Sequence, residues 1–168
     1  MRIALWMLAA LVWSATAAAE NLVGTVVGLA DGDTVTVLDA QKTQHKVRLA
    51  GIDAPEKGQP WGQKSKESLS DQVFSRTVTV EWSKRDRYGR LIGKVLVDGQ
   101  DANLVQVSRG LAWHYKAYER EQSPEDRGRY AAAEIEARNA RQGLWSEPAP
   151  MPPWDYRKMK RAQGKATP

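Results

Sequence analysis

Apolar positions along the chain fall into two spacings, which predict a group of strands followed by helices. Short apolar and β-branched runs predict five strands, at residues 22–27, 34–38, 46–52, 77–82 and 91–97. Residues 62–74 are rich in helix formers and predict a helix between the third and fourth strands. Five short strands with a helix after the third favour an α+β protein built on an OB-type β-barrel, closed or partly open, over parallel βαβ units.

The chain after the last strand is predicted to be helical, which gives about three α-helices added to the barrel. Asp101 is a candidate N-cap for a short helix that ends near Ser108. Ser123-Pro124-Glu125-Asp126 combines an N-cap residue, a proline and an acidic first turn, so a long helix is predicted from there to about Arg141. Gly143 is its candidate C-cap. These elements define one predicted domain over residues 20–147.

The first 19 residues have the layout of a secretory signal peptide. Arg2 supplies the positive charge, an apolar run extends from Ile3 to Val12, and Ala17-Ala18-Ala19 gives the small-residue cleavage pattern. The alternative is an uncleaved anchor, but the apolar run is shorter than the roughly 20 residues of a spanning helix. We therefore expect a periplasmic or secreted protein with no stable membrane partner after leader removal.

Residues 148–168 differ from the domain in composition. They combine a proline-rich start with the basic cluster Arg157-Lys158-Met159-Lys160-Arg161, which predicts an extended, flexible basic tail. Trp154 and Tyr156 are candidates to pack back onto the domain. The tail either has no partner or attracts phosphate weakly.

Charge and cysteine content narrow the classes of site. The 168 residues include no cysteine, which excludes disulfides and thiolate metal sites. The formal net charge is +5, but residues 20–145 hold 19 basic and 18 acidic residues, against five and two in residues 146–168. Because the excess lies in the tail, overall charge supports nucleic-acid binding only weakly, and local clusters have to decide.

The stretch Val47 to Glu56 concentrates unlike side chains at the end of a strand. Arg48, Asp53 and Glu56 lie within it, and Pro55 ends strand pairing. Strict alternation would place Arg48 and Asp53 on opposite faces. A shared site therefore requires a bend or bulge near Gly51.

Two aspartates from separated loops are a candidate cation pair. Asp33 lies in Asp31-Gly32-Asp33-Thr34 at a strand junction, where a hairpin turn with a solvated aspartate is the simpler interpretation. The segment lacks the later acidic positions of an EF-hand loop. Carboxylates from different loops can still hold a hard cation through oxygen, and Asp33 with Asp53 is such a pair.

Arginines and aromatic rings form two further clusters. The segment 85–90 is predicted to be a charged hairpin, but Arg48 and Arg90 near strand ends are suited to bidentate phosphate binding. Residues 113–118 place aromatic rings beside basic residues, which suits either stacking of a nucleobase or packing, and packing is favoured for Trp113. The two histidines, His45 and His114, lack metal-ligand spacing.

Three motifs in order resemble the thermonuclease, or staphylococcal-nuclease-like (SNase-like, micrococcal nuclease), family. They are Asp31-Gly32-Asp33-Thr34-Val35, Val47-Arg48-Leu49 with Asp53-Ala54-Pro55-Glu56, and Asp86-Arg87-Tyr88-Gly89-Arg90. The resemblance covers roughly residues 22–145. It implies a calcium-dependent endonuclease on an OB barrel that hydrolyses DNA and RNA and leaves 3′-phosphate ends. A preference for single-stranded or locally unpaired substrate and a monomeric state are expected with it.

The same resemblance implies roles for individual residues. Asp33, Asp53 and the main-chain carbonyl of Ala54 would hold one Ca²⁺. Glu56 would orient or deprotonate the attacking water, and Arg48 and Arg90 would bind phosphate. The implied substrate-binding residues are Arg87, Tyr88 and either Tyr115 or Tyr118. The chain departs from the family pattern where Ala54 replaces a threonine and where the loop after Glu56 is shorter.

Two other classes compete with the nuclease reading. A non-catalytic OB-fold module would bind nucleic acid without cutting it. Such a module has no physical need for carboxylates beside a phosphate path, because without a cation they repel the strand. A structural or envelope-interaction protein would account for the tail but not for the clusters in the domain.

Overall fold

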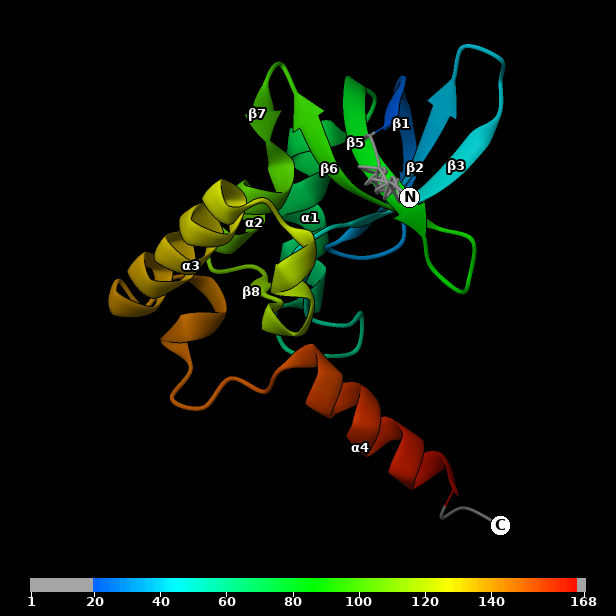
Figure 1. The fold of residues 1–168 in the computed structure, drawn as a ribbon. Helices are drawn as coiled ribbons and strands as arrows, with labels where there is room; N and C mark the ends of the chain where they lie inside the picture. The colour runs from blue at the N-terminus through cyan, green and yellow to red at the C-terminus, as the bar shows by residue number, and fades with distance from the viewer. Residues whose placement is uncertain (1–19, 166–168) are drawn as a thin grey trace, which may run out of the picture.

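The computed structural model describes residues 20–165, so the leader predicted at residues 1–19 lies outside the described part. Its centre is a sheet with strand order β3-β2-β1-β5-β6-β7, and a further parallel pairing of β3 with β6 closes it (Figure 1). Strands β3, β2, β1, β5 and β6 thus form a closed five-stranded barrel, which confirms the α+β, OB-type prediction. The strands are β1 (Glu20–Leu29), β2 (Thr34–Asp39), β3 (Gln44–Leu49), β5 (Thr77–Arg85), β6 (Leu91–Val97) and β7 (Gln100–Asp101).

Alternation of buried and exposed positions explains why these segments close into a barrel. In β6, Leu91, Gly93, Val95 and Val97 are buried, and the residues between them are half-buried. The inward positions of β1, β2, β3 and β5 join them in one apolar core. Burial of this apolar surface is the main stabilising contribution to the fold.

Three predicted helices are present and pack against the barrel. They are α1 (Gly62–Val73), α2 (Ala102–Ser108) and α3 (Pro124–Asn139). The predicted caps form, since Asp101 accepts a hydrogen bond from the Leu104 N–H at 3.0 Å and Ser123 accepts one from Asp126 at 3.1 Å. Helices α1 and α3 both contact α2 or the strands beside it, so the helices cover one side of the barrel (Figure 1).

The predicted third strand is two strands in the structure. Strand β3 ends at Leu49, and β4 (Ile52–Asp53) follows after a bend in which Gly51 adopts φ 73°. Strand β4 pairs with β8 (Trp113–His114), a strand that the sequence pattern did not predict. Two 3₁₀ helices, η1 (Lys116–Glu121) and η2 (Gly143–Ser146), flank α3.

The prediction of an extended tail over residues 148–168 is wrong for residues 153–165, which are helical, and the flexibility of the tail stays a prediction. Residues Pro153–Lys165 form helix α4. Pro153 begins the helix, a position that needs no N–H donor, and its side chain is buried. The first turns of α4 lie against the domain and the rest projects away from it (Figure 1). Within residues 20–165, the helices are all too short or too polar to span a membrane.

Candidate active site

Arg48 lies between two carboxylates from different loops. Its guanidinium group donates to Asp53 Oδ1 at 2.7 Å and forms an ion pair with Asp33. Asp33 precedes β2 and Asp53 ends β4, so the bend at Gly51 brings Arg48 and Asp53 to one side, as the sequence required. The side chains of Asp33, Asp53 and Arg48 are 6%, 0% and 14% exposed. This cluster is therefore a buried charged centre within the fold.

Close packing fixes the loop that carries Asp33. The Gly32 carbonyl accepts a hydrogen bond from the Gln106 side chain at 2.9 Å, and a Cβ on Gly32 would lie 1.9 Å from the hydroxyl of Ser65. Asp31 accepts the N–H of Asp33 at 3.1 Å, which closes the turn. Because the loop is held from both sides, the Asp33 carboxylate is directed at Arg48.

The loop after Asp53 is tied to the same centre. The Ala54 N–H donates to Asp33 Oδ2 at 2.6 Å. Gln59 accepts the Glu56 N–H at 3.1 Å through its side chain, and its own N–H donates to the Glu56 carbonyl at 2.8 Å. A Cβ on Gly62 would lie 2.0 Å from that carbonyl, so only glycine permits helix α1 to start here. These contacts hold Glu56 at the edge of the cluster, half-buried.

A second arginine, Arg157 of α4, reaches the same carboxylates. It donates to Asp53 Oδ1 at 3.1 Å and Oδ2 at 2.7 Å, and to Glu56 Oε1 at 2.6 Å. Asp53 is thus held by Arg48 on one side and by Arg157 on the other. Glu56 and Asp53 are brought together by this shared partner.

Burial and charge act on these groups in opposite directions. Burial lowers the pKa of Arg48, and the nearby carboxylates of Asp53 and Asp31 oppose that shift. The positive charge of Arg90 also lowers the pKa of Arg48, so the two arginines interact electrostatically. The hydrogen bond to Asp53 raises the pKa of Arg157, which keeps that side chain charged.

Arg90 lies beside the cluster on the β5–β6 hairpin. Its guanidinium group donates to Asp86 Oδ2 at 2.8 Å, and the Asp86 carboxylate also accepts the backbone N–H groups of Arg90 and Tyr88. Partial burial of Asp86 opposes its ionisation, but the hydrogen bonds from Arg90 and Tyr88 outweigh it and lower the pKa of Asp86. The Tyr88 ring is exposed and packs under Arg90 and Arg87, at 5.7 Å and 4.9 Å from ring centroid to guanidinium carbon.

The two candidate stacking tyrosines lie together next to the carboxylates. The rings of Tyr115 and Tyr118 have centroids 5.2 Å apart, and Tyr118 is half-exposed. Burial raises the pKa of Tyr115, and the negative charge of Asp53 raises it further, which places this ring within electrostatic reach of the cluster. The Trp154 ring from α4 stacks on Tyr115 at 5.4 Å and 20°.

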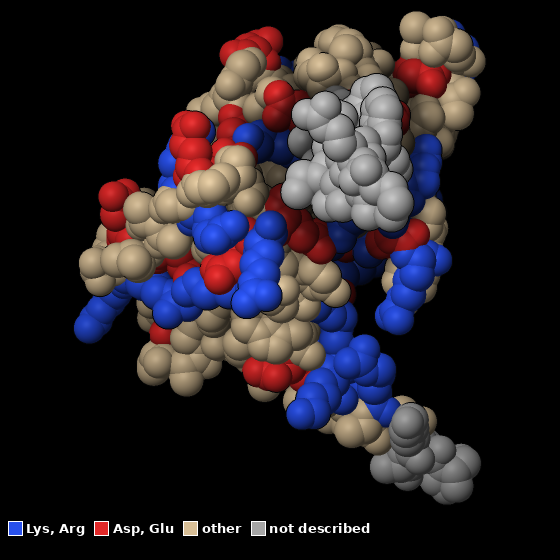
Figure 2. Space-filling view, viewed as in Figure 1, with Lys and Arg blue, Asp and Glu red and all other residues tan. Residues whose placement is uncertain are grey.

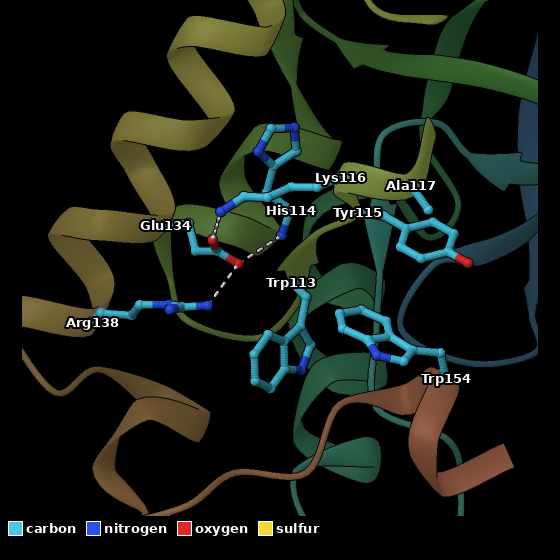
Figure 3. Close-up of a pocket in the computed structure, with 8 residues that line it drawn as sticks. All are labelled: Trp113, His114, Tyr115, Lys116, Ala117, Glu134, Arg138 and Trp154. Atoms are coloured by element: carbon cyan, nitrogen blue, oxygen red, sulfur yellow. Dashed lines mark hydrogen bonds and ion pairs between the residues drawn. The ribbon is translucent and has the colours of Figure 1, made fainter. Parts of the chain in front are cut away.

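Tyr115 and Trp154 also line a cavity of about 350 Å³ (Figure 3). Trp113, Tyr115 and Trp154 form its apolar wall. Buried Glu134 forms its polar wall, where it pairs with Lys116 at 3.2 Å and Arg138 at 3.4 Å and accepts the backbone N–H of His114 (Figure 3). Trp113 is buried, so it packs rather than stacks a ligand, which agrees with the sequence interpretation.

The donor set of the cluster fits a hard cation. Asp33 and Asp53 both pair with the guanidinium group of Arg48, which brings two carboxylates close together, and carboxylate oxygen is the ligand that Ca²⁺ prefers. Among residues 20–165, no three His, Asp or Glu side chains gather as a ready metal site. A cation here would rest on two carboxylates, completed by main-chain carbonyl oxygen, for which Ala54 is the candidate, and by water.

The sequence interpretation missed Arg157 and Trp154 as residues of this region. The sequence assigns Arg157 to a basic tail cluster and indicates for Trp154 only packing onto the domain. The aromatic and basic composition of residues 154–161 was a signal of contact, but it did not indicate where the contact would be.

Comparison with known proteins adds to this geometry. Residues 46–147 match the family model described as staphylococcal nuclease homologue. An uncharacterized endonuclease of Escherichia coli is 41% identical over 138 residues, which cover 82% of this chain and 86% of that protein. A micrococcal nuclease of Shigella flexneri is 40% identical over 144 residues, 80% of each chain. A staphylococcal-like nuclease of Arabidopsis thaliana is 39% identical over 116 residues, 69% of this chain and 34% of that protein.

Proposed function

The chain belongs to the family of staphylococcal nuclease homologues, and from this we propose that it is an exported, calcium-dependent endonuclease. The family and its endonuclease-named relatives support nuclease activity. The proposal adds that the enzyme hydrolyses phosphodiester bonds of DNA and RNA and leaves 3′-phosphate ends. The observation that supports it most strongly is the convergence of Arg48 from β3, Asp53 from β4, and Asp33 and Glu56 from the loops beside β2 and β4, on one charged centre.

The proposed reaction divides among the residues of that centre. Water attacks phosphorus, a new P–O bond forms, and the P–O5′ bond breaks, so the products are a 3′-phosphate and a 5′-hydroxyl that takes up a proton. Glu56, half-buried at the edge of the centre, is the proposed residue that orients that water or accepts its proton. Arg48 and Arg90 place positive charge where the phosphate oxygens gain negative charge.

Bound Ca²⁺ would supply Lewis-acid polarisation of a phosphate oxygen and an ordered water. Asp33, Asp53 and the Ala54 carbonyl are the proposed ligands. A site with so few protein ligands is expected to bind Ca²⁺ weakly, with a dissociation constant of about 10⁻⁴ to 10⁻³ M. Weak binding suits an enzyme that works outside the cytoplasm, where Ca²⁺ is abundant.

The substrate is proposed to be single-stranded or locally unpaired, and the enzyme to be a monomer. Stacking needs a base that is free of its partner strand. Tyr115 and Tyr118 offer adjacent rings beside Asp53, and Tyr88 and Arg87 are exposed on the neighbouring hairpin. A strand laid across these groups would place its phosphates near Arg48 and Arg90.

A digestion assay tests this proposal. The protein from residue 20 to 168 is incubated with single-stranded DNA and with RNA, in Ca²⁺ or in EDTA, and product ends are identified with and without phosphatase. We expect cleavage in Ca²⁺, none in EDTA, and 3′-phosphate ends. Absence of cleavage in Ca²⁺ would contradict the proposal.

The substitution Glu56→Gln separates an enzyme from a module that only binds. We expect oligonucleotide binding, measured by fluorescence anisotropy, to be retained, and single-turnover cleavage to fall by at least about 100-fold, because the carboxylate no longer takes part in proton transfer. Glu136→Gln, at an exposed position of α3, is the matched control. Equal cleavage by Glu56→Gln and the control would refute the role of Glu56.

A further inference from the structure

Arg157 occupies the oxygens that the proposed site needs. Its two terminal nitrogens donate hydrogen bonds to both carboxylate oxygens of Asp53. The nitrogen that binds Asp53 Oδ1 also donates to Glu56 Oε1. Asp53 is fully buried, and Arg48 already donates to its Oδ1. With Arg157 in place, little of the Asp53 carboxylate is left for a cation, and Glu56 is directed toward a guanidinium group.

Three further contacts hold the start of α4 over the site. Tyr156 donates its hydroxyl to the Gly58 carbonyl at 2.8 Å, and Gln59 donates its side-chain N–H to the Met151 carbonyl at 2.5 Å. Trp154 stacks on Tyr115. Gly58 and Gln59 belong to the loop that carries Glu56, so α4 is docked on the catalytic loop itself.

One helix therefore covers two parts of the proposed site. Arg157 neutralises the carboxylates that would bind the cation and position the water. Trp154 covers the face of Tyr115, which is one of the two candidates for stacking a base, and it leaves Tyr118 half-exposed. Because one turn of α4 covers both the carboxylates and Tyr115, this helix would compete with the cation and with the substrate for the same positions.

We propose that α4 is an autoinhibitory latch, in which Arg157 and Trp154 occupy the cation and base positions until the helix is displaced. This inference rests on the proposed function. The protein then exists as latched and open molecules in equilibrium, and only the open fraction, with α4 displaced, binds Ca²⁺ at full strength. The measured dissociation constant is then the intrinsic one divided by that fraction.

The exposed half of α4 offers a means of displacement. Lys158, Lys160 and Arg161 are exposed, and Figure 2 shows basic side chains gathered on the projecting helix. A polynucleotide would attract them through its phosphates. The Arg157 side chain is itself 35% exposed, so water and salt weaken its ion pairs and the latch can open.

Calcium affinity tests the latch directly. Binding of Ca²⁺ is measured by isothermal titration calorimetry for the wild type and for Arg157→Ala, Arg161→Ala and Trp154→Ala, each from residue 20 to 168. We expect Arg157→Ala to tighten binding by about tenfold, as for a latch that is open in about one molecule in ten. Arg161→Ala removes the same charge from the exposed part of α4 and is expected to leave the affinity unchanged.

Trp154→Ala separates the latch from simple charge repulsion. It keeps every charge and removes the ring contacts of Trp154 with Tyr115 and Trp113, so tighter Ca²⁺ binding by this variant would come from release of α4 and not from loss of a positive charge. If Trp154→Ala and Arg157→Ala both bind Ca²⁺ no more tightly than the wild type, the latch is refuted. If Arg157→Ala leaves affinity unchanged and lowers the turnover number, Arg157 is a phosphate-positioning residue and the latch is wrong.

Spin labels follow the helix itself. Because the chain has no cysteine, Lys64→Cys on α1 and Lys160→Cys on α4 provide two unique labelling positions, both exposed. Electron–electron distance measurements are expected to give one narrow distribution without Ca²⁺ and a broad one with Ca²⁺ and a non-cleavable oligonucleotide. An unchanged distribution would overturn the latch.

Absence of cleavage by every variant, including those with α4 released, would instead overturn the proposed nuclease activity.

Discussion

The barrel and helix α4 both supply an arginine to Asp53, but they do so in different ways. Arg48 comes from a strand inside the closed barrel, and its guanidinium group is held by two buried carboxylates. Arg157 comes from a helix at the end of the chain, is 35% exposed, and is held by a few contacts of the first turn. Arg48 is therefore part of the barrel itself, whereas Arg157 binds the site from a helix that packs on the outside of the domain.

This difference explains how one carboxylate can serve both stability and regulation. A buried charge whose partner cannot move stabilises the loop geometry of the site. A partner such as Arg157, whose side chain is 35% exposed, is reached by water and salt, so it is displaced more easily than a buried partner. The site is therefore rigid on its barrel side and adjustable on its α4 side.

The largest expected effect is the difference in the free energy of unfolding that is lost when Arg48 or Arg157 is removed. Arg48→Met leaves the carboxylate of Asp33 buried without its charged partner, and we expect it to lower the free energy of unfolding by about 3 kcal/mol. Arg157→Met removes a partly exposed partner, and we expect a loss below about 1 kcal/mol. Urea unfolding followed by circular dichroism measures both. Equal losses would show that the two arginines are equally structural.

Removal of residues 149–168 is expected to have a smaller effect on catalysis. No residue assigned to cation, water or phosphate lies in that segment, so cleavage at saturating Ca²⁺ should persist within about threefold of the full chain. Initial rates on a labelled single-stranded oligonucleotide measure this. Complete loss of cleavage would place α4 inside the catalytic machinery and would favour a function that resides in the tail.

The smallest expected effect concerns Asp86, which orients Arg90. In the unfolded chain an aspartate has its ordinary pKa, 3.8, and the hydrogen bonds of the folded hairpin lower it. A group whose pKa is lowered by folding stabilises the fold above its unfolded pKa, and this contribution is lost as pH falls through the folded value. The stability difference between wild type and Asp86→Asn should thus be present at about pH 6 and shrink by about pH 3. A constant difference would exclude an ionised Asp86 as its source.

The strands and the helix ends could be predicted from the sequence, because alternation of apolar and polar residues and helix caps each depend on only a few neighbouring positions. The caps at Asp101 and Ser123 and the bend at Gly51 follow from neighbouring residues alone. The pairing of β4 with β8 was missed because two-residue strands carry no periodic signal.

Helix α4 shows where such reasoning stops. Arg157 is 104 residues from Asp53, and its partner depends on how the whole domain folds. A proline-rich, basic segment usually fails to bury enough apolar surface to order itself. Here Trp154 packs against Trp113 and Tyr115, which are brought together with Asp53 only when β8 has paired with β4.

The substitution Asp53→Asn tests most directly whether the buried centre around Asp53 cleaves nucleic acid. Asp71→Asn, on the exposed face of α1, is the matched control. Cleavage of a labelled single-stranded DNA is measured over a range of Ca²⁺ concentrations. We predict that Asp53→Asn lowers cleavage by at least about 100-fold at the Ca²⁺ concentration that saturates the control, because it removes the buried carboxylate assigned to the cation. Cleavage by Asp53→Asn equal to that of Asp71→Asn would contradict the account.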